Sequence, residues 1–167
     1  MKQIILLALG LILSIGASAT EITCIAKGKS GVGGNDSGPF TSDSRLDIKI
    51  GENQETKALQ MQAKGTIKVA NEWEKVEPEQ LTPENAYIGL FDSDVISEVS
   101  NAKARKYKDY VRFGINANET TGQEDGMWGY LVISKKFATA DTFDAAYVFQ
   151  AGDHMGGTLH FTCSPSH

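Results

Sequence analysis

Hydrophobic and polar residues alternate most strictly along the stretch from Leu59 to Val69. Met61, Ala63 and Ile67 continue the apolar positions of this stretch, and polar side chains stand between them. Only a β-strand sends alternate residues to opposite faces, so one face of this strand meets a core and the other meets water. Gly65 falls on the apolar positions and predicts a bend or a bulge there.

Shorter segments repeat this pattern along the chain. Alternating segments lie at Leu46–Ile50, Val111–Ile115 and Leu159–Phe161. Runs rich in β-branched and aromatic residues lie at Ile22–Lys27, Tyr87–Phe91, Trp128–Ser134 and Ala146–Gln150. All of them are typical of strands. Trp128 to Ile133 is apolar on both faces, which predicts a strand covered on its second face by a loop, a ligand or a partner.

These segments predict an all-β protein. About eight strands with no long amphipathic helix favour an antiparallel up-and-down barrel, with a two-sheet β-sandwich as the alternative. The one tract with helical periodicity is Asp94–Lys106, where Val95, Ile96 and Val99 share a helical face. We expect at most a short helix there.

The N-terminal residues have the form of a secretion signal. Lys2 precedes an apolar run from Ile4 to Ile15, and Ala17-Ser18-Ala19 supplies a small-x-small cleavage pattern. We expect residues 1–19 to be removed and residues 20–167 to form a single domain in the periplasm or outside the cell. No later segment has enough consecutive apolar residues to span a membrane as a helix.

Export changes how the two cysteines are interpreted. Cys24 and Cys163 are the only cysteines, and they lie near the two ends of the predicted domain. An oxidising compartment favours a disulfide between them, and no short Cys-x-x-Cys spacing indicates a metal or redox site. Because Cys163 has the parity of Leu159 and Phe161, we expect a bridge on the core side that joins the first and last strands.

Composition excludes some partners. The net charge of −5 disfavours non-specific binding to nucleic acid or to anionic lipid. No motif indicates a cofactor. A protein or a small ligand therefore remains as the expected partner.

Long polar connections separate the strands at Gly28–Ser44, Asn71–Ala86 and Asn116–Gly126. Gly31 to Gly38 resembles one turn of the calcium-binding Gly/Asp repeats, but such sites need stacked copies, so we interpret it as a surface loop. Asp92 and Asp94 form a weak candidate metal site, since two carboxylates one residue apart reach a single hard cation in a loop. The favoured interpretation of these two residues is a solvated turn.

Residues for catalysis are scarce. His160 belongs to the polar face of the last strand, His154 lies in a Gly-rich turn and His167 ends the chain. No Gly-x-Ser-x-Gly motif places a nucleophile beside a histidine. An envelope-active hydrolase would have to use scattered carboxylates, for which the candidates are Asp92, Asp94, Glu119 and Asp125. We therefore favour a protein that is not an enzyme.

Two features favour binding. Trp73 stands among charged residues in the acidic loop Asn71–Ala86, where a tryptophan needs a surface to pack against, so it is a candidate partner contact. One alternative function is that the protein inhibits a secreted hydrolase by inserting this loop into the active site of that enzyme. The many aromatic residues pack a core or line a barrel cavity for a small apolar ligand. The favoured hypothesis is an exported binding module that engages its ligand or partner through long loops or a cavity.

Overall fold

The computed structural model describes residues 19–33, 38–70, 76–98, 108–116, 127–151 and 155–166. The strands in this part are β1 (Thr20–Ser30), β2 (Val32–Gly33), β3 (Phe40–Glu52), β4 (Leu59–Ala70), β5 (Ala86–Asp92), β6 (Ile96–Ser97), β7 (Tyr110–Asn116), β8 (Met127–Ser134), β9 (Phe143–Ala151) and β10 (Met155–Pro165). Short 3-10 helices occupy Pro78–Gln80 (η2) and Lys135–Ala138 (η4). Every strand expected from the sequence is confirmed. Among these described residues, no helix is long and apolar enough to cross a membrane.

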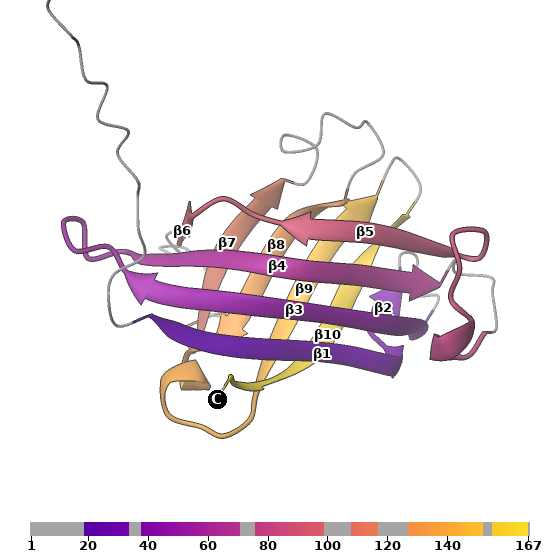
Figure 1. Ribbon diagram of the computed structural model, residues 1–167, viewed down its shortest axis with the longest axis horizontal. Helices are drawn as coiled ribbons and strands as arrows, with labels where there is room; N and C mark the ends of the chain where they lie inside the picture. Colours follow the sequence, from indigo (N-terminus) through magenta and orange to yellow (C-terminus); the bar gives the residue numbers. More distant parts are fainter. Residues whose placement is uncertain are drawn as a thin grey trace, which may run out of the picture.

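The strands form one continuous antiparallel sheet that curls into a half-barrel (Figure 1). Their order is β5-β4-β3-β1-β10-β9-β8-β7, with β2 added to β10 and β6 added to β4. In Figure 1, β1, β3, β4 and β5 run across the front, and β7 to β10 cross behind them. An isolated bridge pairs Glu98, just after β6, with Phe113 of β7. The sheet is thus of the up-and-down barrel type and is not divided into two.

The inward face of the sheet builds the core. Met61, Ala63, Ile67 and Val69 of β4 are at most 1% exposed, as their alternation predicts. Inward residues from the other long strands join them in a single hydrophobic cluster. Burying such side chains contributes about 1.5–3 kcal/mol each for the larger ones. The period-two pattern therefore carries most of the information that specifies this fold.

The disulfide lies where strand parity predicts it. Cys24 of β1 and Cys163 of β10 are direct cross-strand partners, with their Cα atoms 4.0 Å apart and their sulfurs bonded. Both side chains are buried in the core. The bridge ties the first strand to the last and indicates that the protein matures in an oxidising, extracellular-type environment.

The predicted loop from Gly28 to Ser44 is wrong for most of its length. β1 continues to Ser30 and β3 begins at Phe40, and these two residues pair with each other. The polar residues Ser42 and Ser44 occupy inward positions of β3 and are buried. They are tolerated there because each finds hydrogen-bond partners.

The serine contacts reach both neighbouring strands. The Ser42 hydroxyl donates to the Ala26 carbonyl at 3.1 Å. The Ser44 hydroxyl accepts from the Lys68 amide at 2.9 Å and donates to the Lys68 carbonyl at 3.1 Å. A buried hydroxyl satisfied in this way costs little, so β3 extends through a sequence that has the composition of a loop.

The helix expected in Asp94–Lys106 is wrong for the part that the structure describes. Residues 94–98 contain the short strand β6, and Ile96 pairs with Met61 of β4. Ile96 packs against the core from this position. Pairing with an existing strand edge outweighs the weak local helical pattern.

Two glycines mark places where strands approach too closely for a side chain. A Cβ atom on Gly65 would lie 2.0 Å from the Arg45 carbonyl oxygen, and one on Gly129 would lie 1.8 Å from the Val148 carbonyl oxygen. The register of β3 and β4 is unbroken across Gly65, so no bulge interrupts the pairing at this glycine. Such glycines allow an antiparallel sheet to curl tightly.

Candidate functional site

The outer face of the sheet differs between its two halves. Over β1, β3, β4 and β5 it carries ion pairs that join Lys49 to Glu21 at 2.6 Å and Lys64 to Asp92 at 3.4 Å. These side chains are more than half exposed. Exposed pairs of this kind contribute little to stability. The same half also exposes Ile25 of β1 and Leu90 of β5, so its surface is charged but not uniformly polar.

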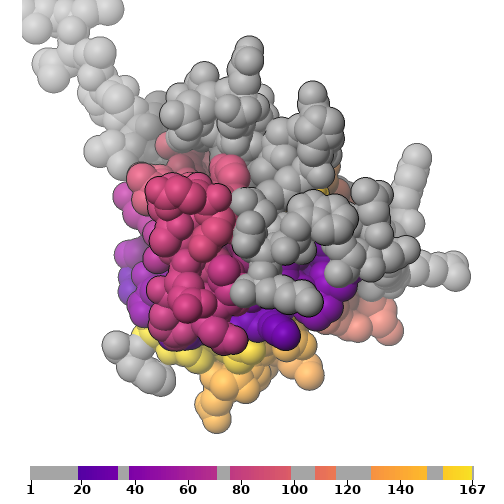
Figure 2. Space-filling model, turned by 90° about the vertical axis from the view of Figure 1, so that its right-hand side faces the viewer, coloured from indigo at the N-terminus to yellow at the C-terminus, as the bar shows by residue number. Residues whose placement is uncertain are grey.

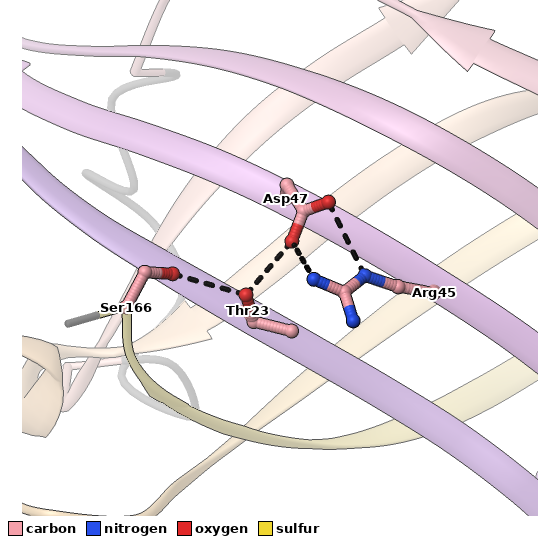
Figure 3. Close-up of polar contacts among 4 residues, drawn as sticks. All are labelled: Thr23, Arg45, Asp47 and Ser166. Carbon is pink, nitrogen blue, oxygen red and sulfur yellow. Dashed lines mark hydrogen bonds and ion pairs between the residues drawn. The ribbon is translucent and has the colours of Figure 1, made fainter.

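A polar network lies on β1 and β3 of this half and reaches Ser166, just after β10 (Figure 3). Asp47 accepts hydrogen bonds from Arg45 Nη2 at 2.9 Å and Nε at 3.2 Å, and from the Thr23 hydroxyl at 2.7 Å. The Thr23 hydroxyl also lies 3.0 Å from that of Ser166. The Arg45 guanidinium and the Thr23 hydroxyl hold the pKa of Asp47 below its usual value, although partial burial opposes them.

This network is poorly suited to acid-base catalysis. A carboxyl group whose pKa is lowered stays ionised and cannot donate a proton near neutral pH. The shallow depression around the network is lined by strand residues that include Gln62 and Lys64, and no histidine or cysteine is among its lining residues. We interpret the network as a structural feature that fixes β3 against β1 and the C-terminal end of β10.

The lowered pKa of Asp47 predicts a measurable dependence of folding stability on pH. Because its pKa is lower in the folded state, its stabilising contribution is present above the unfolded-state pKa, about 4, and is lost as the pH falls through the folded-state pKa. Urea unfolding from pH 7 down to pH 2 should therefore show a smaller acid-induced loss of stability for Asp47→Asn than for the wild type. Equal losses in the two proteins would contradict this assignment.

The other half of the outer face carries a row of exposed apolar side chains. Tyr130 of β8 pairs with Val148 of β9, Val148 pairs with Thr158 of β10, and Thr158 pairs with Val32 of β2. The exposed fractions are 38% for Tyr130, 41% for Val148 and 47% for Val32. We call Tyr130, Val148 and Val32 the exposed row.

An arginine lies on the β7 side of the row. The Arg112 guanidinium carbon is 3.6 Å from the centroid of the Tyr130 ring, which is a cation-π contact. The neighbouring cross-strand positions hold Val132, which is buried, and the half-buried Ala146. Val132 and Ala146 thus extend the apolar area beside the exposed row, but they are less exposed than the members of the row.

The exposed row accounts for the double apolar pattern expected for Trp128–Ile133. Leu131 and Ile133 point inward and are fully buried, whereas Tyr130 and Val132 belong to the outer face. The sequence pattern found the strand and its unusual outer face. It did not find Val32, which falls inside the predicted Gly31–Gly38 loop and reaches the sheet only because β2 pairs with β10.

The candidate metal residues lie at the end of β5. Asp92 is ion-paired with Lys64, and Asp94 is exposed. Between them, Ser93 is buried and its hydroxyl accepts from the Ala63 amide at 2.8 Å. No group of three or more metal-binding side chains occurs within the described residues. Cation binding by Asp92 and Asp94 stays a prediction.

Of the remaining candidate residues, His160 lies within the described residues and the others lie outside them. His160 lies exposed on the outer face of β10, as its parity predicts. Trp73, Glu119, Asp125, His154 and His167 lie outside the described residues.

Fold and surface together define an all-β antiparallel half-barrel that is tied by one disulfide and carries an apolar row on one outer face. No protein-family model, no curated protein and no solved structure matches the chain. The function of the protein must therefore be inferred from the physical chemistry of the residues in this chain.

Proposed function

We propose that the protein is an exported, non-enzymatic binding protein of the periplasm or extracellular space, and that it engages a partner protein through the exposed row. The observation that carries this proposal is the alignment of Tyr130, Val148 and Val32 along one line across the sheet, with Thr158 of β10 between the two valines. Isolated exposed apolar residues are common on protein surfaces, but a group aligned on one rigid sheet is typical of an interaction site.

The chemistry of the row supports a protein partner. Tyrosine and arginine are enriched among residues that dominate binding energy at protein interfaces. The Arg112–Tyr130 contact holds both side chains in place before binding, which lowers the entropy lost on association. Because the row lies on paired strands, its geometry changes little when a partner binds.

A second pair of exposed apolar residues fits an interface less well. Leu90 is 82% exposed and Ile88 is 38% exposed, and both lie on the outer face of β5. Their cross-strand neighbours are the polar residues Thr66 and Lys68, so this pair does not continue into an apolar area. Leu90 therefore serves as a matched control for the row.

Export supports the same function. The apolar N-terminal run and the small-x-small pattern before Thr20 favour secretion, and the buried disulfide suits an oxidising compartment. The hydrolase alternative has less support, since Asp92 is ion-paired and Glu119 and Asp125 lie outside the described residues.

Capture from the native compartment with matched bait proteins tests this proposal. Val148→Glu places a charge in the row and should weaken the Kd of the captured partner about thirtyfold, which corresponds to about 2 kcal/mol. Leu90→Glu adds the same charge to an exposed strand position outside the row and should change the Kd less than about twofold. Biolayer interferometry with the captured partner measures both values.

Two outcomes would overturn the assignment of the row. In one, Val148→Glu and the wild type capture the same proteins with equal affinity. In the other, both glutamate variants weaken binding equally, which would indicate a general effect of negative charge. Circular dichroism of both variants confirms that the sheet is intact before binding is compared.

A further inference from the structure

Tyr147 of β9 carries a hydroxyl group without a hydrogen-bond partner. Its side chain is fully buried, and its oxygen is the one buried side-chain polar atom without a partner in the described part of the chain. The buried serines Ser42, Ser44 and Ser93, by contrast, are all hydrogen-bonded. A buried hydroxyl that makes no hydrogen bond destabilises the protein, so its presence requires an explanation.

Aromatic rings surround Tyr147 inside the half-barrel. The Phe91 ring of β5 meets it edge-on with the centroids 5.5 Å apart, and the Phe149 ring stacks on it at 5.8 Å. Phe40 of β3 packs edge-on against Phe149 at 5.9 Å. These three phenylalanine rings offer the Tyr147 hydroxyl no hydrogen-bond acceptor.

A half-buried tyrosine lies on the same side of the interior. Tyr87 and Phe91 both face inward from β5, and Gly89 stands between them. A Cβ atom on Gly89 would lie 2.7 Å from Cε1 of Tyr87, so the Tyr87 ring occupies the space over this glycine. Burial, together with the nearby Tyr87, raises the pKa of Tyr147, which keeps its hydroxyl protonated as a donor.

The Tyr87 ring borders this region. The Tyr87 side chain is only half-buried, whereas Phe91, Tyr147 and Phe149 are at most 6% exposed. A ligand in this region would displace the Tyr87 ring from the space over Gly89. β5 begins at the end of the half-barrel that faces the viewer in Figure 2, where the segment from η2 to β5 forms one flank.

We infer that the interior between Gly89 and Tyr147 binds a small, mainly apolar molecule with one hydrogen-bond acceptor, such as a ketone oxygen, which accepts from the Tyr147 hydroxyl. The Tyr87 ring occupies this place when the ligand is absent. The site is separate from the exposed row, because Tyr147 faces the core while Val148 faces outward.

Titration with prodan, a neutral naphthalene ketone whose emission reports the polarity around its carbonyl group, tests the site. The wild type should bind prodan saturably with blue-shifted emission. Tyr147→Phe keeps the ring and removes the hydroxyl, and it should weaken the Kd about tenfold. Gly89→Val fills the space over the glycine and should weaken binding further. Tyr110→Phe, on the outer face of β7, should leave the Kd within about twofold.

Thermal unfolding without ligand tests the same hydroxyl independently. Because the oxygen has no partner, Tyr147→Phe should raise the Tm by about 2–4 °C. A lower Tm would show that the hydroxyl has a partner in the folded protein and would overturn the inference. Absence of saturable prodan binding by the wild type, or equal Kd values for the wild type and Tyr147→Phe, would also overturn it.

Discussion

Replacing Cys24 and Cys163 together by alanine should lower the free energy of unfolding by about 5 kcal/mol. The bridge closes a loop between residues 139 positions apart, so it removes a large conformational entropy from the unfolded chain. A loss of this size is a large fraction of the stability of a typical domain. Urea unfolding of the oxidised wild type and the double variant at pH 7 gives the difference directly.

The control for this experiment is the wild type reduced with dithiothreitol, which keeps every side chain and breaks only the bond. It should unfold at nearly the same urea concentration as the double variant. A loss below about 1 kcal/mol in both would mean that the β1–β10 pairing is maintained without the bridge, and that the bond contributes little to the fold.

Gly129→Ala should be the most destabilising single methyl addition in the sheet. Its Cβ atom would stand 1.8 Å from the Val148 carbonyl oxygen, a backbone atom that moves only if β8 and β9 separate. We expect a loss of about 3 kcal/mol, at the upper end of what overpacking costs. Guanidinium unfolding of the purified variant measures it, and low yield of folded protein would agree with it.

Gly28→Ala is the matched control. A Cβ atom on Gly28 meets nothing within 4 Å, so the methyl group is accommodated and only the positive φ of 86° opposes it. This strain should cost about 1 kcal/mol. If Gly129→Ala cost no more than Gly28→Ala, the close approach of β8 and β9 would not be an essential feature of the sheet.

The strands that sequence reasoning found are those whose polar positions face water. β4 follows its alternation from Leu59 onward because no buried position in it is polar except Gln60. The start of β3 was not predicted, because the polar residues Ser42 and Ser44 point inward. Their hydrogen bonds to Ala26 and Lys68 depend on strands distant in sequence, so no local pattern could reveal them.

The candidate sites depended still more on tertiary structure. The apolar outer face of β8 was visible as a run without alternation, but the exposed row also needs the registers that align Val148 and Val32 with Tyr130. Register is set by the packed sheet as a whole. The unpartnered hydroxyl of Tyr147 likewise becomes apparent only when every neighbour is placed, although the aromatic content had suggested an interior ligand.

The two proposed sites use opposite faces of one strand. Tyr147 faces the interior of the half-barrel, and Val148, the next residue, lies in the exposed row on the outside. β9 thus connects a region suited to a small ligand with a surface suited to a protein. In this proposal, the ion-paired surface over β1, β3 and β4 remains in solvent.

Crosslinking in intact source cells shows whether a partner protein contacts the exposed row. The photoreactive residue p-benzoylphenylalanine is placed at Val148 in one strain and at Leu90 in another. After irradiation, we expect a discrete adduct with one partner protein at position 148 and none at position 90. No adduct at position 148, or the same adducts at both positions, would contradict it.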